Sequence, residues 1–167
     1  MSQKNNPLIF VVEDNEYYNR LIVDNLEKQK FTNIKFFLSG EDCIRSMNLK
    51  PDIIIQDYNL GGMNGIEVLK RAKKIYPEVE FIFLTAQDTT EIAVNSMRYG
   101  AYDYIVKDGV TFDKVIDRIQ KIVKTKTLEG TISTIKYYKI GFMILLFIII
   151  LFSILFYFTE IFSIHNV

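Results

Sequence analysis

Short apolar runs alternate with stretches of helical periodicity along the first 126 residues of the chain. Five runs are predicted to be β-strands, at residues 8–12, 34–38, 53–55, 79–84 and 102–106. The run at 53–55 consists of three isoleucines, as expected of a strand buried on both faces. Strands that alternate with helices predict an α/β fold, a parallel sheet covered by helices on both sides. For this length we expect the five-stranded, doubly wound, flavodoxin-like order 2-1-3-4-5.

Four segments between and after these strands repeat apolar residues every three or four positions, and each repeat predicts the buried face of a helix. In chain order the faces are Tyr18, Leu21, Ile22 and Leu26; Ile66, Leu69, Ala72 and Ile75; Ala93, Met97 and Gly100; and Phe112, Val115, Ile116, Ile119 and Val123. A further short helix is predicted to begin at Ser39 and Gly40 and to run to about Met47. Asp14 and Asn15 are the candidate caps of the first helix.

Polar residues with related chemistry follow four of the five predicted strands. Glu13 and Asp14 follow the first strand, Asp57 the third, Thr85 the fourth and Lys107 the fifth. In the 2-1-3-4-5 order these ends converge on the edge where open α/β sheets bind ligands. Three neighbouring carboxylates repel one another unless a cation neutralises them, and hard oxygen ligands suit Mg²⁺. A hydroxyl and an ammonium group suit phosphoryl oxygens, so the residues predict a Mg²⁺-dependent phosphoacceptor with Asp57 as the nucleophile.

The order and spacing of these residues resemble those of response-regulator receiver domains, the phosphoacceptor domains of bacterial two-component signalling. The resemblance covers residues 7 to about 126 and rests on Glu13, Asp14, Asp57, the loop from Leu60 to Gly65 with Glu67, and Thr85, Ala86, Tyr104 and Lys107. It implies that Asp57 accepts a phosphoryl group from a histidine kinase or a phosphotransfer protein. It also implies a set of Mg²⁺ ligands, namely Glu13, Asp14, Asp57 and the backbone carbonyl of Asn59.

The same resemblance assigns roles to five further groups around Asp57. Thr85 and Lys107 are expected to contact the phosphoryl group. Tyr104 is expected to move together with Thr85 as the conformational switch. Asn59 and Gln87 occupy the positions at which this family sets the rate of dephosphorylation.

Two positions depart from the family pattern. Gly61 stands where the family usually has proline, and glycine there predicts a more mobile loop. Asp108 follows Lys107 where the family usually has a cis proline. A cis bond before any other residue costs about 2.5–4 kcal/mol, so the Lys107–Asp108 bond is expected to be trans. The carboxylate of Asp108 is also a second candidate partner for the Lys107 ammonium group.

Residues 140–158 contain no charged side chain, and 15 of these 19 residues are Ile, Leu or Phe. About 20 apolar residues span the hydrocarbon core of a bilayer, so this segment is predicted to be a transmembrane helix. The expected organisation is a receiver domain at 1–126, a juxtamembrane linker at 127–139, the transmembrane helix at 140–158 and a short tail at 159–167. Lys136 and Lys139 precede the span, which by the positive-inside rule places the domain on the cytoplasmic side of the inner membrane.

Composition limits the remaining functions. Twenty basic and 20 acidic residues balance, so overall charge does not indicate nucleic-acid binding, and no DNA-binding module fits between the domain and the span. Cys43 is the only cysteine and is expected to be a small apolar residue of the second helix. The only histidine, His165, lies third from the end, which argues against histidine-based catalysis within this chain. No N-terminal signal peptide is expected.

Three lysines near the end of the last predicted domain helix form either a lipid-facing or a solvated face, namely Lys121, Lys124 and Lys126.

These patterns together predict a membrane-tethered, single-domain response regulator rather than an enzyme. Its expected partners are the phosphodonor, membrane lipid, an unidentified downstream protein and, as an option, a second copy of the chain. The alternative is a non-phosphorylated pseudo-receiver acting as a membrane scaffold or dimerisation module, which Gly61 and Asp108 favour. A phosphohydrolase with an aspartyl nucleophile is disfavoured, because such enzymes need a second acid where this chain has Asn59.

Overall fold

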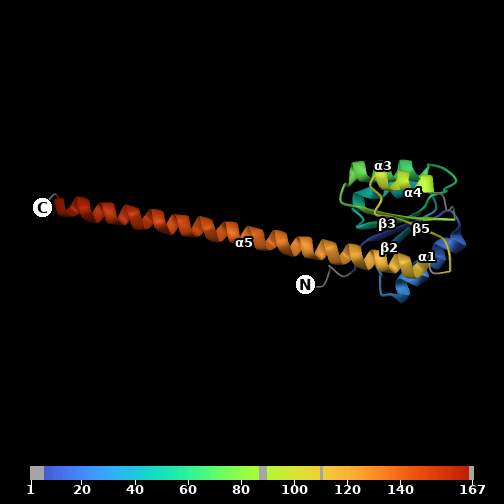
Figure 1. Cartoon of the computed structure of the whole chain (residues 1–167), viewed down its shortest axis with the longest axis horizontal. Coiled ribbons are helices and arrows are strands. Elements are labelled where there is room, and N and C mark those ends of the chain that lie inside the picture. Colours follow the sequence, from blue (N-terminus) through green and yellow to red (C-terminus); the bar gives the residue numbers. More distant parts are fainter. Residues whose placement is uncertain (1–5, 87–89, 110, 166–167) are drawn as a thin grey trace. The chain divides into compact units, whose positions relative to one another are not determined.

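The computed structural model describes residues 6–86, 90–109 and 111–165 (Figure 1). By its internal contacts the chain divides into two compact units, Met1–Lys124 and Thr125–Val167. The first unit contains the whole sheet and the helices that cover it. The second consists of the continuation of the last helix.

The first unit is built on a five-stranded parallel sheet. Its strands are β1 (Ile9–Val12), β2 (Ile34–Phe37), β3 (Ile53–Asp57), β4 (Glu80–Thr85) and β5 (Asp103–Val106). They lie in the order β2-β1-β3-β4-β5, and every neighbouring pair is parallel. The predicted α/β fold and strand order are therefore confirmed. All five strands point their carboxyl ends toward one edge, which is where the candidate site lies.

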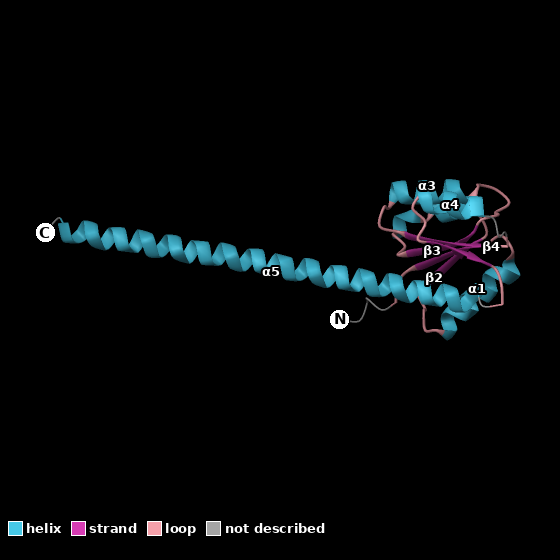
Figure 2. Ribbon diagram, viewed as in Figure 1, coloured by secondary structure: helices cyan, strands magenta, loops and turns pink. Residues whose placement is uncertain are grey.

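Helices cover both faces of the sheet, with α3 and α4 on one side and α1 on the other (Figure 2). The helices are α1 (Glu16–Lys28), α2 (Gly40–Arg45), α3 (Gly65–Ile75), α4 (Thr90–Arg98) and α5 (Thr111–His165), with a 3₁₀ turn, η1, at Met47–Leu49. Side-chain oxygens of Asn15, Ser39 and Asn64 cap α1, α2 and α3 by accepting hydrogen bonds from first-turn N–H groups. Because Asn15 caps α1, the other candidate cap, Asp14, keeps its carboxylate for contacts at the sheet edge.

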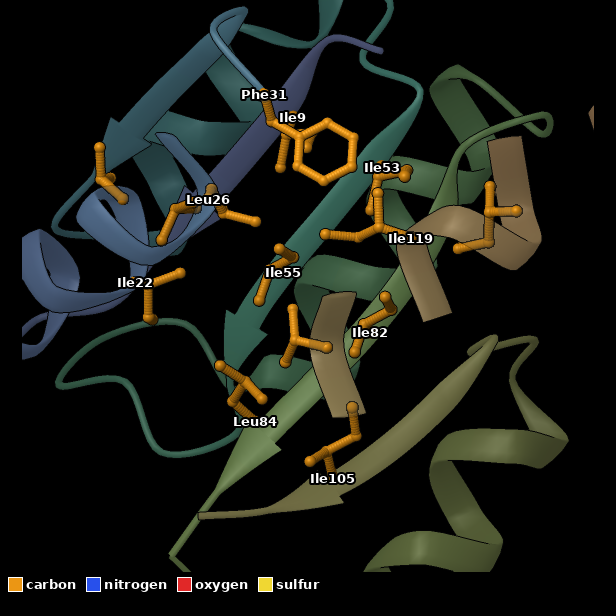
Figure 3. Packing of buried hydrophobic residues seen from close by; sticks show 14 residues of the cluster. Ile9, Ile22, Leu26, Phe31, Ile53, Ile55, Ile82, Leu84, Ile105 and Ile119 are labelled. Carbon is orange, nitrogen blue, oxygen red and sulfur yellow. The ribbon is translucent and has the colours of Figure 1, made fainter. Parts of the chain in front are cut away.

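Alternation of side chains along the strands divides the core into two clusters. The first packs one face of the sheet against α1 and the beginning of α5, and Figure 3 shows Ile9, Ile22, Leu26, Phe31, Ile53, Ile55, Ile82, Leu84, Ile105 and Ile119 from it. The second packs the opposite face, including Ile54 and Phe83, against α2 and α3. All three isoleucines of β3 are fully buried, as predicted.

Cys43 belongs to the second cluster and is fully buried, so its expected place among the apolar residues of α2 is confirmed. Burial raises the pKa of its thiol to about 12. The thiol is therefore protonated at neutral pH and is not a nucleophile.

Two predicted helix faces differ from the observed ones, that of α3 at its end and that of α4 over most of its length. Ile75 is 53% exposed and Met97 is 45% exposed, whereas Val68 and Ser96 are fully buried. Ser96 tolerates burial because its hydroxyl donates to the carbonyl of Ile92, 2.8 Å away. Gly100 lies beyond the end of α4 with a φ of 88°, where glycine is favoured as a helix stop. In α3 the predicted Leu69 and Ala72 are fully buried, so the prediction is wrong only for Ile75 and in omitting Val68. In α4 apolar spacing selected Met97 and ignored Ser96, a polar residue whose hydroxyl is satisfied within the helix.

Gly65 begins α3 at a point where a side chain has no room. A Cβ atom there would lie 2.9 Å from the carbonyl of Tyr58, 3.0 Å from Gln56 Nε2 and 3.0 Å from a ring carbon of Phe83. We expect Gly65→Ala to lower the free energy of unfolding by about 1–3 kcal/mol, the range for overpacking a filled core. Urea unfolding of the full chain in detergent measures the effect. Gly109→Ala is the control, because no atom lies within 4 Å of its added Cβ; an equal effect at both positions would contradict the steric explanation.

The second unit contains the apolar part of α5. Residues Ile135–Ile154 have a mean hydropathy of 2.3, and none of this window is buried. By length and composition this stretch is suited to cross a membrane. The predicted linker at 127–139 is helical and continuous with the rest of α5.

Candidate functional site

Lys107 lies at the centre of the site, at the carboxyl end of β5. Its ammonium nitrogen is 2.7 Å from Glu13 Oε2, at the end of β1, and 2.7 Å from Asp57 Oδ2, at the end of β3. Its backbone N–H donates to the carbonyl of Thr85 at 2.7 Å, which fixes the end of β5 to that of β4. The strand order therefore brings together the acids and the lysine that the sequence placed at separate strand ends.

Little water reaches the charged groups of this site, so they interact at short range with little screening. Glu13 is only 2% exposed, and burial raises the pKa of its carboxyl despite the neighbouring lysine. Burial lowers the pKa of Lys107, but hydrogen bonds to Asp57 and Glu13 outweigh it, so the pKa lies above its ordinary value. The lysine consequently stays charged and is the counter-ion that allows both acids to remain near each other.

Tyr18 of α1 forms one wall beside this ion pair. Its ring centroid lies 4.1 Å from the Lys107 nitrogen, a cation–π contact. Burial raises the pKa of the Tyr18 hydroxyl, so the ring stays neutral at physiological pH. Tyr18 was predicted as a helix-face residue, and the structure gives it this additional contact.

Asn19 supports the same corner of the sheet and was missed as a site residue by the sequence reasoning. It is 2% exposed, and its amide nitrogen donates to the carbonyl of Glu13 at 3.0 Å and to that of Phe37 at 3.1 Å. It thus ties the end of β1 to the end of β2. A signal was present, because Asn19 is in helical register with Ile22, Val23 and Leu26.

The loop between β3 and α3 is held by carboxylates that accept its backbone N–H groups. Asp57 Oδ1 accepts from Asn59 at 3.1 Å, and Asp14 Oδ2 accepts from Gly61 at 3.1 Å. Glu41, at the start of α2, accepts from Met63 at 3.0 Å. Glu41 was not identified from the sequence, where it resembles an ordinary acidic residue in the first turn of a helix.

The second departure from the family pattern, Asp108, is accommodated without disturbing Lys107. The bond between them is trans, in line with the expectation, since no peptide bond among the described residues is cis. The Asp108 carboxylate pairs with Lys114 Nζ at 2.6 Å, and its carbonyl accepts from the Thr111 hydroxyl at 2.8 Å. Asp108 therefore forms the entry to α5, while the close ion pairs of Lys107 are made with Glu13 and Asp57.

Of the other predicted residues, Thr85 and Asn59 follow the same edge of the sheet, whereas Tyr104 lies within β5. Thr85 is fully buried at the end of β4. Tyr104, in β5, pairs in register with Phe83 and packs partly buried on the second core cluster. Asn59 is exposed in the loop after Asp57. Gln87 lies outside the described residues.

The oxygen donors at this edge suit a hard divalent cation in their chemistry. Glu13, Asp14 and Asp57 supply carboxylates from two neighbouring strand ends, which is the ligand type that Mg²⁺ prefers. In the observed arrangement, however, Glu13 and Asp57 bind Lys107 and Asp14 binds the Gly61 N–H group. Within the described parts of the chain, no three acidic, cysteine or histidine side chains are grouped so that they could hold a metal ion. The donor set therefore fits Mg²⁺, but its side chains would have to rearrange to bind it.

The fold and this edge define a class of protein, the receiver domains of α/β architecture. The chain belongs to the response regulator receiver domain family, whose model matches residues 9–120. Members of this family are signalling domains that interact with histidine kinases or phosphotransfer proteins, and they typically bind Mg²⁺ at the phosphorylation site.

Relatives of the chain include several bacterial regulators. It is 33% identical over 116 residues to the transcriptional regulatory protein CssR of Bacillus subtilis, covering 70% of this chain and 51% of that protein. It is 41% identical over 70 residues to the luminescence regulatory protein LuxO of Vibrio campbellii, covering 41% of this chain and 16% of LuxO. The matched part of the chain thus spans about half of the length of CssR and about a sixth of that of LuxO.

Solved structures show the same fold. The signal receiver domain of a putative LuxO repressor protein from Vibrio parahaemolyticus matches with a TM-score of 0.68 and 27% identity, over 75% of this chain and 96% of that one. The receiver domain of the Francisella response regulator 1452 matches with a TM-score of 0.66 and 24% identity, over 72% of this chain and 99% of that one.

Proposed function

We propose that this protein is a membrane-tethered, single-domain response regulator that accepts a phosphoryl group on Asp57. The observation that carries the proposal is the position of the Lys107 ammonium group, 2.7 Å from the Asp57 carboxylate and 2.7 Å from Glu13. An isolated aspartate at a strand end has no specific meaning, but one paired with a partly buried lysine beside a second acid is suited to hold added negative charge.

In this proposal Asp57 is the nucleophile. Its carboxylate oxygen forms the new O–P bond, while the N–P bond of a phosphohistidine in the donor breaks and its electron pair stays on the imidazole nitrogen. Lys107 and the Thr85 hydroxyl bind the transferred phosphoryl oxygens. Tyr104 responds to the movement of Thr85, and Asn59 and Gln87 set the rate at which water removes the phosphoryl group.

Glu13, Asp14, Asp57 and the Asn59 carbonyl are the residues that would hold Mg²⁺. When bound, the cation supplies positive charge that neutralises the phosphoryl oxygens. Glu13 also keeps Lys107 directed at Asp57, because the buried Glu13 carboxylate forms an ion pair with the Lys107 ammonium group.

The apolar part of α5 is the membrane anchor in this proposal, with the domain on the cytoplasmic side of the inner membrane. Output is contact with another protein, with no nucleic-acid binding by this chain, which acts either alone or as a homodimer. Tethering confines the domain near a membrane-bound kinase and raises their effective concentration.

Phosphoryl transfer is tested by incubating the purified full chain in detergent with ³²P-labelled acetyl phosphate and MgCl₂. The wild type should acquire a label that hydroxylamine releases, as expected of an acyl phosphate, and Asp57→Asn should acquire none. Asp24→Asn is the control, because Asp24 lies on the surface of α1 in an exposed pair with Arg20. A wild type that stays unlabelled, or a label that survives in Asp57→Asn, would contradict the proposal and favour the scaffold alternative.

A further inference from the structure

The Gly61 N–H group makes a contact that the usual residue of the family at this position could not make. It donates to Asp14 Oδ2 at 3.1 Å, joining the loop after β3 to the end of β1. Proline has no N–H group, so a chain with proline here lacks this hydrogen bond. Among the described residues, this is the only hydrogen bond of the Asp14 carboxylate.

Each of the three acids at the sheet edge is thereby engaged by a donor from the protein itself. Glu13 and Asp57 share the Lys107 ammonium group, and Asp14 takes the Gly61 N–H. In this arrangement the described acids do not form a group that could hold a metal ion. Asp14 is the exposed member of the three, so it is the one whose carboxylate can turn most freely.

We infer that the Gly61 N–H group is a latch that holds Asp14 away from the cation site, so that Mg²⁺ and Gly61 compete for the same carboxylate. The inference rests on the proposed function, in which Asp14 is a Mg²⁺ ligand. Gly61 acts through Asp14 and is a positioning residue.

The competition has a predictable direction and size. Hydrogen bonds to a carboxylate are stronger than those between neutral groups, but this one is exposed to water, which weakens it. Removing the donor should therefore tighten Mg²⁺ binding by about 3- to 10-fold. The wild-type chain, which has this donor, should therefore need a higher Mg²⁺ concentration to fill the site than the same domain with proline at position 61.

Two substitutions at position 61 separate the N–H group from the glycine itself. Gly61→Pro removes the donor. Gly61→Ala keeps it, and its added Cβ would lie 3.4 Å from Asp14 Oδ2, an ordinary contact. The dissociation constant is measured by titrating MgCl₂ into the ¹⁵N-labelled full chain in detergent micelles and following backbone amide resonances.

We expect Gly61→Pro to bind Mg²⁺ about 3- to 10-fold more tightly than the wild type, and Gly61→Ala to remain within about twofold of it. In the wild type and in Gly61→Ala, the amide proton of residue 61 should also shift upfield on Mg²⁺ addition, as its hydrogen bond to the carboxylate is lost. Equal or weaker binding by Gly61→Pro overturns the latch, and so does an amide proton that does not move. The second readout decides the matter even if the proline variant does not fold.

Asp14→Asn distinguishes failure of the latch from failure of the proposed site. If the wild type binds Mg²⁺ and Asp14→Asn does not, the metal site stands and the Gly61 variants test the latch alone. If Asp14→Asn binds Mg²⁺ as the wild type does, Asp14 is not a ligand, and both the latch and the proposed ligand set fail.

Discussion

Lys107→Ala is expected to lower the free energy of unfolding at pH 7 by about 2–4 kcal/mol, because it leaves two nearby carboxylates without their counter-ion. Breaking a fully buried ion pair by removing one partner costs about 3–5 kcal/mol. The expected cost of Lys107→Ala is smaller than that of breaking a fully buried pair, because the Lys107 and Asp57 side chains are 16% and 12% exposed and some water reaches them. Urea unfolding of the full chain in detergent, followed by tyrosine fluorescence, measures the change.

The effect of Lys107→Ala should depend on pH in a defined direction. Folding raises the pKa of Glu13 above its ordinary value of 4.5. The contribution of Glu13 to the free energy of unfolding is therefore complete below pH 4.5, and it decreases as the pH rises through the pKa of Glu13 in the folded protein. Without the lysine, which lowers this pKa, the pKa of Glu13 rises further and the loss extends to higher pH. The stability difference between wild type and variant should therefore be smallest near pH 5 and increase toward pH 8. In the wild type, the raised pKa of Lys107 predicts a loss of stability only above about pH 10.5.

Two controls test the ion-pair explanation. Lys114→Ala breaks the Lys114–Asp108 pair, whose side chains are 44% and 42% exposed, and should cost at most about 1 kcal/mol. Adding Glu13→Gln to Lys107→Ala removes the buried charge and should restore part of the lost stability, while flattening the pH dependence. A double variant that is less stable than Lys107→Ala at pH 7 would show that the lysine stabilises the domain by packing rather than by charge.

The architecture could be predicted from the sequence because it depends on strong, repeated signals. Five apolar runs, each followed by helical spacing, leave few parallel arrangements, and the strand order then fixes which ends meet. Helix orientation was less predictable, as Met97 and Ser96 show, because one buried serine can satisfy its hydroxyl within the helix. A pattern of apolar residues does not show that such a serine is buried.

The members of the site were predictable, but their bonding was not. Residue type and strand position placed Glu13, Asp57 and Lys107 at one edge, which the structure bears out. The contacts of Gly61 and Glu41 depend on the path of a short loop, where the donors are backbone N–H groups that every residue except proline carries. The sequence identifies Gly61 only as a departure from a family pattern, and its hydrogen bond appears once the loop is in place.

Two arginines in the centre of the apolar window of α5 are expected to release the protein from the membrane. In the segment 140–158, 15 residues are Ile, Leu or Phe, and at about −0.3 to −0.6 kcal/mol each they favour insertion by roughly 5–9 kcal/mol. Ile144→Arg with Ile148→Arg opposes this by about 6–8 kcal/mol, since each arginine costs about 2.5–3.5 kcal/mol and each lost isoleucine adds to the cost. The wild type should pellet with membranes and resist extraction at alkaline pH, whereas the double variant should move to the soluble fraction.

The matched control is Leu128→Arg with Ile132→Arg, a pair with the same four-residue spacing on the same helix. Both side chains are exposed, at 54% and 65%, and both precede the window Ile135–Ile154. These arginines lie on the side that the positive-inside rule favours, so this variant should pellet as the wild type does. If the control variant is also soluble, α5 binds another protein or lipid through its charge pattern and does not span the bilayer. If the wild type itself is soluble, the membrane anchor is wrong, and phosphoryl transfer to Asp57 stands as a separate proposal.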